Sequence, residues 1–335
     1  MACATQSVDE EARVWRYVIR RLGWLVVTLL VITAITFIIY FVLPPVSPAV
    51  LFAGKEATPQ LVATVEKNLG LNHPVWIQYL LFLKHLVLGD QYGWPGLGFS
   101  YVNHAPVRSL IGGRIVITFT LAVGAVILWL AMGITAGIIS AVKHRSLWDR
   151  LSMGVSVFFI SAPVFWLGLI FLWLFWNKLG IAAGTGYDAP SQYGLLPWLG
   201  HMIMPWIVLA LLYAGWYARM TRDSALETLR EDFIRTARGK GLSEARVLIR
   251  HVLRACLAPL LTMVGMDFAG LVSGTVIVEV VFNLNGIGQW AVQAVSSDDI
   301  PSVLAVTVLG AVVVIVANLV VDILYAYVNP RIRYK

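Results

Sequence analysis

The chain has 335 residues, of which 59% are hydrophobic and only 13% are charged, and its mean hydropathy is +0.79. Soluble domains carry about 25% charged residues, so this composition excludes an ordinary water-soluble globular protein and indicates that lipid surrounds much of the chain. The 25 Lys and Arg outnumber the 18 Asp and Glu, but they lie beside apolar segments. Membrane topology therefore explains the basic excess better than nucleic-acid binding does.

The N-terminal part predicts a cytoplasmic segment followed by a membrane span. Residues 1–21 are polar and end in a basic cluster, and residues 22–43 then contain no charge. Twenty-two uncharged, predominantly apolar residues can cross a hydrocarbon core about 30 Å thick. A cleaved signal peptide is the alternative, but its apolar core would be about 7–15 residues long and followed by a small-residue cleavage site. Pro44-Pro45 fits that pattern poorly, so the segment is interpreted as an uncleaved first span.

Residues 44–114 contain no uninterrupted apolar run of spanning length and are expected on the extracytoplasmic side. Within them, residues 61–71 and 75–88 predict short amphipathic helices, and residues 89–98 predict a glycine-rich turn. The remaining core, 115–328, contains five further predicted spans, at about 115–142, 151–176, 201–218, 257–282 and 302–328, and residues 329–335 form a tail. The predicted fold class is all-α, a polytopic membrane protein with six transmembrane helices and both termini on one side.

The distribution of basic residues predicts which side that is. With the N-terminus inside, the cytoplasmic segments 1–21, 143–150, 219–254 and 329–335 hold 19 Lys and Arg, against six outside. Five of those six lie in the long loop 44–114, which counts little in the positive-inside rule. Both termini are therefore expected in the cytoplasm. Cys3 and Cys256, the only cysteines, fall on that side too and offer no disulfide framework.

A polar island, residues 219–256, interrupts the apolar pattern between the fourth and fifth predicted spans. It carries nine of the 25 Lys and Arg. Ser224-Ala225-Leu226-Glu227 has the pattern of a capping box, which predicts a helix start at Ser224. Apolar residues recur at helical spacing before and after Gly239-Lys240-Gly241, namely Leu226, Leu229, Phe233 and Ala237, then Leu242, Ala245, Leu248 or Ile249, and Val252. The pattern predicts a helix, a tight glycine turn and a second helix that dock a soluble partner.

The island also carries a specific resemblance. Its residues run Arg235-Thr236-Ala237-Arg238-Gly239-Lys240-Gly241-Leu242-Ser243-Glu244, followed by Arg250-His251-Val252-Leu253-Arg254 and Pro259. This run resembles the cytoplasmic signature loop of ABC-importer permeases, in particular the dipeptide/oligopeptide subgroup. Stretches along nearly the whole chain agree with that subgroup, at 16–22, 69–71, 78–79, 161–169, 282–288 and 329–333.

The chain departs from the general permease signature at several positions. That signature begins Glu-Ala-Ala and later has Ile-x-Leu-Pro, and only Ala237, Gly241 and Leu253 match it here. The peptide subgroup shares these substitutions. Asn285 stands where that subgroup usually has proline.

The resemblance implies a type I ABC-importer permease fold in a bacterial or archaeal cytoplasmic (inner) membrane. It implies that residues 235–244, the ten residues of the run just given, form a coupling helix that seats in a cytoplasmic ATPase. It also implies a second homologous permease subunit, two ABC ATPases that bind ATP and magnesium, and an extracytoplasmic peptide-binding protein. The chain has no G-x-x-x-x-G-K-[ST] phosphate loop, so it is expected to be no enzyme and to hold no cofactor of its own.

Asp267 is the candidate residue of the translocation pathway. It lies in the middle of the fifth predicted span, where a carboxylate facing lipid would cost about 2.5–3.5 kcal/mol. A pathway-lining role and a structural hydrogen bond between spans both remain open. Glu279 and Asp322 lie nearer span ends and are expected to be solvated at the interface, and Gly270-x-x-x-Gly274 is expected to pack against a neighbouring helix.

The other polar residues favour plainer roles. The Asp298-Asp299 pair lies in the last outer loop, where a solvated loop is favoured over a contact with a binding protein. The six histidines show no paired spacing and predict no metal site, and His251 is assigned to the docking surface.

Alternative functions differ in the residues they need. Within the permease class, nickel chelates, sugars or another small solute are alternatives to peptides. An intramembrane serine protease would need a histidine facing its nucleophile, and Ser273 has only His201, at a span end. A secondary transporter or channel would have no use for a docking island.

Overall fold

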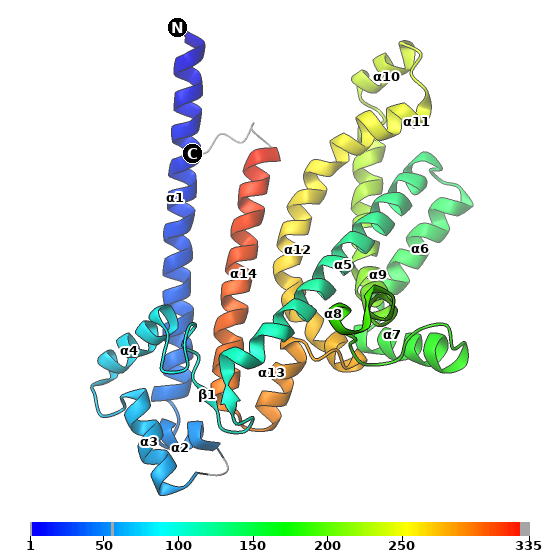
Figure 1. The fold of residues 1–335 in the computed structure, drawn as a ribbon. Helices are drawn as coiled ribbons and strands as arrows, with labels where there is room; N and C mark the ends of the chain where they lie inside the picture. Colours follow the sequence, from blue (N-terminus) through cyan, green and yellow to red (C-terminus); the bar gives the residue numbers. More distant parts are fainter. Residues whose placement is uncertain (1, 55–56, 329–335) are drawn as a thin grey trace. The chain divides into compact units, whose positions relative to one another are not determined.

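The computed structural model describes residues 2–54 and 57–328. Apart from one two-stranded ladder, the regular elements of these residues are helices (Figure 1). The chain divides into two compact units, one formed mostly by residues 1–116 and 289–323 and the other by residues 117–288. The predicted tail at 329–335 lies outside the described residues.

The first unit begins with α1 (Ala2–Phe37), which continues as a short π-helix, Ile38–Val42. Three shorter helices follow, α2 (Pro48–Ala53), α3 (Pro59–Leu69) and α4 (Val75–Leu88), and then the antiparallel strands β1 (Phe99–Ser100) and β2 (Ala105–Pro106). Most of α13 (Ile287–Ser296) and α14 (Ile300–Val328) also belongs here. The helices expected at 61–71 and 75–88 are thus confirmed as α3 and α4.

Two features hold the first unit together. An apolar cluster joins Phe52 of α2 and Val65 of α3 to Leu304 of α14. Beside it, Asp299 is 1% exposed, and its Oδ2 accepts hydrogen bonds from Ser100 Oγ at 2.6 Å, Ser302 Oγ at 2.5 Å and Asn103 Nδ2 at 3.0 Å. The expectation that Asp299 belongs to a solvated loop is therefore wrong. This Asp299 cluster ties the loop between β1 and β2 to the start of α14.

The second unit is a bundle of long helices. It contains most of α5 (Val107–Val142), α6 (Leu147–Ser161), α7 (Val164–Phe171) with its π-helical continuation Leu172–Lys178, α8 (Pro190–Tyr193), α9 (Leu195–Thr228) and α12 (Leu253–Phe282). Gly137 allows α5 and α9 to approach closely, because a Cβ there would lie 2.6 Å from the carbonyl oxygen of Ala218. The bundle core is apolar and includes fully buried Trp129 and Tyr217.

Helix length and composition agree with a polytopic membrane protein. Four helical segments are long and apolar enough to cross a bilayer, and six are when each bent pair counts as one span. The four are Ile19–Val42, Val107–Val142, Leu195–Thr228 and Ile300–Leu319. The all-α fold is therefore confirmed within the described residues, and the six expected spans agree with the count in which each bent pair is one span.

The third predicted span differs from its expected form. Residues 151–176 were expected to form one span, but α6 ends at Ser161 and α7 begins at Val164, with a bend of 106° between the two helical segments. Pro163 explains the break, since its ring excludes the helical conformation from the residue before it. Ala162 accordingly adopts an extended backbone with ψ 131°.

Candidate coupling site

The polar island connects the ends of two long helices of the second unit. Figure 1 shows α10 and α11 between the end of α9 and the start of α12. Helix α9 runs without a break to Thr228, whose Oγ1 donates a hydrogen bond of 2.8 Å to the Ser224 carbonyl. The predicted helix start at Ser224 is therefore wrong: Ser224 lies in the last turns of α9, whose backbone amides already have partners four residues earlier. The new helix starts after Glu231, where the backbone is extended (ψ 146°).

Helix α10 (Asp232–Gly239) presents most of its surface to solvent. Only Ile234 and Ala237 are buried, and Ile234 is 0% exposed. Phe233, expected on the apolar stripe, is instead 49% exposed. The two residues differ by one position, or about 100° around a helix, so the buried face is rotated from the expected one.

The glycine turn after α10 is confirmed. Gly241 has a φ of +78°, in the left-handed region that favours glycine. Its N–H donates to the Arg238 carbonyl at 2.9 Å, and the Leu242 N–H donates to the Ala237 carbonyl at 3.3 Å. These bonds satisfy carbonyls that the end of a helix leaves without partners.

Arg238 and Glu244 join the two sides of this turn. The guanidinium donates from Nε to Oε1 at 2.8 Å and from Nη2 to Oε2 at 3.2 Å. Both side chains are exposed, so the pair adds little stability but gives the turn a fixed polar outer edge.

The return segment is α11 (Glu244–Val247) followed by a π-helix, Leu248–Val252, that leads into α12. Val247 and Val252 are fully buried, whereas Ala245 and Ile249 of the expected stripe are exposed, Ile249 to 70%. A π-helical turn contains more residues than an α-helical one. Apolar positions that were predicted from a repeat of 3.6 residues therefore no longer fall on the buried face in this segment.

The ten predicted coupling residues form one continuous surface. Ala237 is buried and Leu242 is partly buried, and the other eight are exposed, namely Arg235, Thr236, Arg238, Gly239, Lys240, Gly241, Ser243 and Glu244. Two surface hollows of opposite charge flank them. The acidic hollow is lined by Asp223, Leu226, Glu227, Arg230, Glu231 and Asp232, and the basic hollow by Phe233, Arg250, His251, Arg254 and Ala255. Such a surface can recognise a partner by charge as well as by shape.

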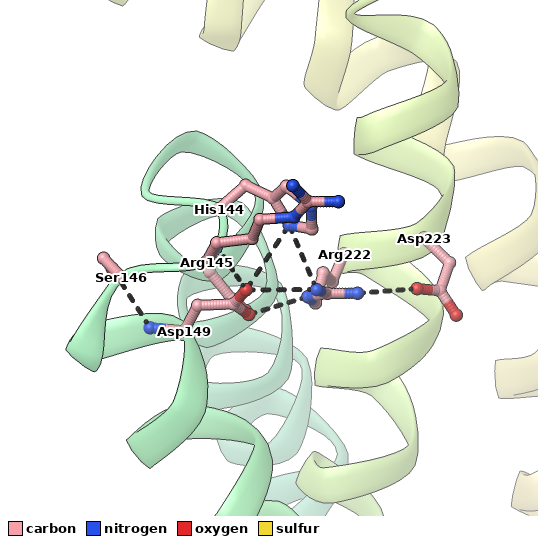
Figure 2. A network of polar contacts seen from close by, with 7 residues as sticks. His144, Arg145, Ser146, Asp149, Arg222 and Asp223 are labelled. Carbon is pink, nitrogen blue, oxygen red and sulfur yellow. Dashed lines mark hydrogen bonds and ion pairs between the residues drawn. The ribbon is translucent and has the colours of Figure 1, made fainter.

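An ion pair between a buried carboxylate and a partly buried guanidinium holds α9 where the island begins. Figure 2 shows Asp149, at the start of α6, facing Arg222 of α9. Arg222 donates from Nε to Asp149 Oδ1 at 2.8 Å and from Nη2 to Oδ2 at 3.1 Å. Asp149 also accepts from the Arg145 backbone N–H at 2.8 Å and from Ser140 Oγ, and it is 5% exposed.

The hydrogen bond from Arg222 holds the pKa of Asp149 well below its usual range, helped by those from Ser140 and the Arg145 backbone and opposed by burial. The carboxylate is therefore ionised at neutral pH. Asp149 and Arg222 lie 73 positions apart, and no local sequence pattern pairs them. The only feature of the sequence that could have drawn attention to this pair is Asp149 itself, the one acidic residue in the otherwise basic segment 143–150.

The remaining acidic candidates have defined partners. Asp267 Oδ2 accepts a hydrogen bond of 2.7 Å from Tyr217 Oη, so the hydrogen bond between spans, one of the two roles left open, exists. Glu279 is 0% exposed and accepts a bond of 2.6 Å from Thr118 Oγ1, so its expected solvation is wrong. Gly286 packs against this carboxylate, where a Cβ would lie 2.5 Å from Glu279 Cδ. The side chain of Asp322 lies outside the described residues, as does any contact of Gly274.

These features define a multi-pass helical membrane protein with an exposed polar segment between two long helices of its bundle. Residues 133–334 match the family described as "Binding-protein-dependent transport system inner membrane component", and residues 14–122 match the N-terminal component of the same kind of system. The chain belongs to this family, the membrane permeases of ABC importers. It is accordingly a transport permease rather than an enzyme.

Individual relatives cover nearly the whole chain. The chain is 36% identical to the dipeptide transport system permease protein DppB of Alkalihalophilus pseudofirmus, over 95% of this chain and 99% of that protein. It is 39% identical to the glutathione transport system permease protein GsiC of Escherichia coli, over 95% of this chain and 99% of that protein. The MetNI methionine ABC transporter, solved in an inward-facing conformation, has a similar fold, with a TM-score of 0.52 and 15% identity over 67% of this chain and 98% of that chain.

Proposed function

We propose that this chain is the permease subunit of an ATP-driven importer of dipeptides or oligopeptides in a bacterial or archaeal cytoplasmic membrane. It would form the translocation pathway with a second, homologous permease. An extracytoplasmic binding protein would deliver the peptide, and two ABC ATPases would bind ATP and magnesium. The similarity to a dipeptide and a glutathione permease over nearly the full chain supports a peptide substrate over nickel chelates or sugars.

The observation that carries this proposal is the exposed segment 235–244, held between two long helices. Its outer surface is polar, whereas Ile234 and Ala237 anchor its inner side. Such a segment suits contact with a soluble ATPase. The glycine turn and the Arg238–Glu244 pair give it a defined shape for that contact.

Force applied to the segment would travel into the bundle along α9 and α12. Helices transmit rigid-body movement well, and the Asp149–Arg222 pair fastens α9 to the start of α6. A push on α10 would therefore move α9 and α6 together. Repeated closing and opening of the ATPases would switch the pathway between outward-facing and inward-facing states.

Uptake of a radiolabelled peptide into proteoliposomes containing the complete complex tests the proposal. We expect uptake that requires both ATP and the binding protein. Lys240→Glu should reduce it by about tenfold, because the reversed charge opposes docking by about 1.4 kcal/mol. Arg150→Glu is the matched control, since Arg150 is exposed, basic and outside the segment.

Two results would overturn parts of the proposal separately. Uptake of nickel chelates or sugars in place of peptides would show that peptides are not the substrate. Equal uptake by the Lys240→Glu and unmodified complexes would reject the role of the segment.

A further inference from the structure

Asp267 is a partly exposed carboxylate at the middle of a long apolar helix. It is the fifteenth of the 30 residues of α12, and Tyr217 Oη binds one of its two oxygens. Among the described residues, no Lys, Arg or His forms an ion pair with it, in contrast to Asp149. A carboxylate at this depth is costly in lipid and is stabilised by water or by a cation.

Tyr217, which binds Asp267, belongs to a group of packed aromatic side chains. Trp129 of α5 and Tyr217 of α9 are fully buried, with ring centroids 5.7 Å apart. Tyr213, one turn before Tyr217, stacks on Trp129 at 4.5 Å and remains partly exposed. The burial of Tyr217 and Trp129 fixes the hydroxyl that orients the carboxylate, so Asp267 is held in one position.

A carboxylate beside aromatic rings is the chemistry that recognises an organic ammonium group. The carboxylate supplies the charge, and the face of an accessible aromatic ring, here partly exposed Tyr213, attracts cations. A metal ion would need more oxygen or nitrogen ligands, and no group of three or more His, Cys, Asp or Glu suited to a metal occurs among the described residues. A neutral solute would gain no charge attraction from this arrangement, and an anionic one would be repelled.

We propose that Asp267, oriented by buried Tyr217 and assisted by the partly exposed ring of Tyr213, binds the α-ammonium group of a peptide as it crosses the membrane. This inference rests on the proposed function and names the part of the substrate that the permease itself recognises. It also assigns Asp267 to the translocation pathway and explains its hydrogen bond with Tyr217, since that bond orients the carboxylate for the ligand.

Equilibrium binding of trialanine and of N-acetyl-trialanine to the complete permease–ATPase complex, without the binding protein, tests this. The unmodified complex should bind trialanine about tenfold more tightly than the acetylated peptide, a difference typical of one desolvated charge interaction. Asp267→Asn should bring the two affinities within about twofold, because the amide still accepts the Tyr217 bond but carries no charge.

Two further variants separate ligand binding from structure. Asp267→Glu should retain the preference for the free amino group. Tyr217→Phe removes the hydrogen bond and keeps the charge, so it should weaken that preference without abolishing it. Equal melting temperatures for Asp267→Asn and the unmodified complex would support the ligand role.

The inference is overturned if the unmodified complex shows no preference for trialanine, including no binding at all, or if Asp267→Asn keeps that preference. A purely structural role would instead lower the melting temperature in both Asp267→Asn and Tyr217→Phe while leaving the affinity ratio intact. Failure of the proposed function itself would be seen elsewhere, as the absence of peptide uptake by the unmodified complex.

Discussion

At the scale of single residues, the pair of Asp149 and Arg222 shows how a charge is accommodated at the edge of an apolar bundle. Both carboxylate oxygens of Asp149 accept hydrogen bonds, and two nitrogens of the Arg222 guanidinium each donate to one of them. Removing one partner of a buried pair is costly because the remaining charge loses its partner. The pair therefore matters more for stability than any exposed pair of the island.

Arg222→Ala is expected to destabilise the second unit by about 3–5 kcal/mol, the cost of leaving a buried carboxylate unpaired. The melting temperature of the purified complex measures this. The depressed pKa of Asp149 means that its contribution is present at neutral pH and is lost only in acid, below the ordinary Asp value of about 3.9. In the unmodified protein this contribution should therefore be constant between about pH 5 and pH 8.

Arg235→Ala is the matched control, because Arg235 forms an exposed pair with Asp232 at 3.3 Å. Its loss should change stability by less than about 1 kcal/mol. An equal effect of the two variants would contradict the assignment of Arg222 as the partner of a buried charge.

At the scale of elements, the shape of the island depends on one backbone conformation. Gly241 needs its left-handed φ for the chain to reverse after α10, whereas Gly239 lies within α10 and has no such requirement. Neither glycine has an atom within 4 Å of where a Cβ would lie, so steric contact does not distinguish them.

Gly241→Ala should therefore cost about 1–2 kcal/mol through strain alone. It should also reduce uptake per ATP hydrolysed, because the turn that shapes the proposed coupling segment is distorted. Gly239→Ala should be neutral or slightly stabilising, since alanine favours a helix by about 1 kcal/mol over glycine. Identical transport and melting behaviour of the two variants would show that the turn does not determine coupling.

The elements also show what local sequence can predict. Composition and periodicity were sufficient for the long helices and for α4, whose bounds match those expected. They could not choose between Phe233 and Ile234 as the buried residue, because both are apolar and the choice depends on what packs beneath. The pairs Asp149–Arg222 and Asp299–Ser100 join residues 73 and 199 positions apart, beyond the reach of any local pattern.

At the scale of the whole molecule, membrane orientation is a prediction from the charge distribution. A cysteine at Lys240 should react with a membrane-impermeant thiol reagent in inside-out vesicles and not in right-side-out ones. A cysteine at Lys67, exposed in α3, should show the opposite pattern. Cys3 is replaced by serine in both, and buried Cys256 is retained. Labelling of position 240 from the outside would reject the predicted topology.

The Asp299 cluster has a consequence for biosynthesis. Ser100 emerges from the ribosome 199 residues before its acceptor, and Leu304, which completes the apolar cluster with Phe52 and Val65, emerges later still. At about 5–20 residues per second, the early segments stay without these partners for roughly 10–40 s of translation. The contacts of the Asp299 cluster and of this apolar cluster can form only when α14 begins to be made, so the first unit is completed late in synthesis.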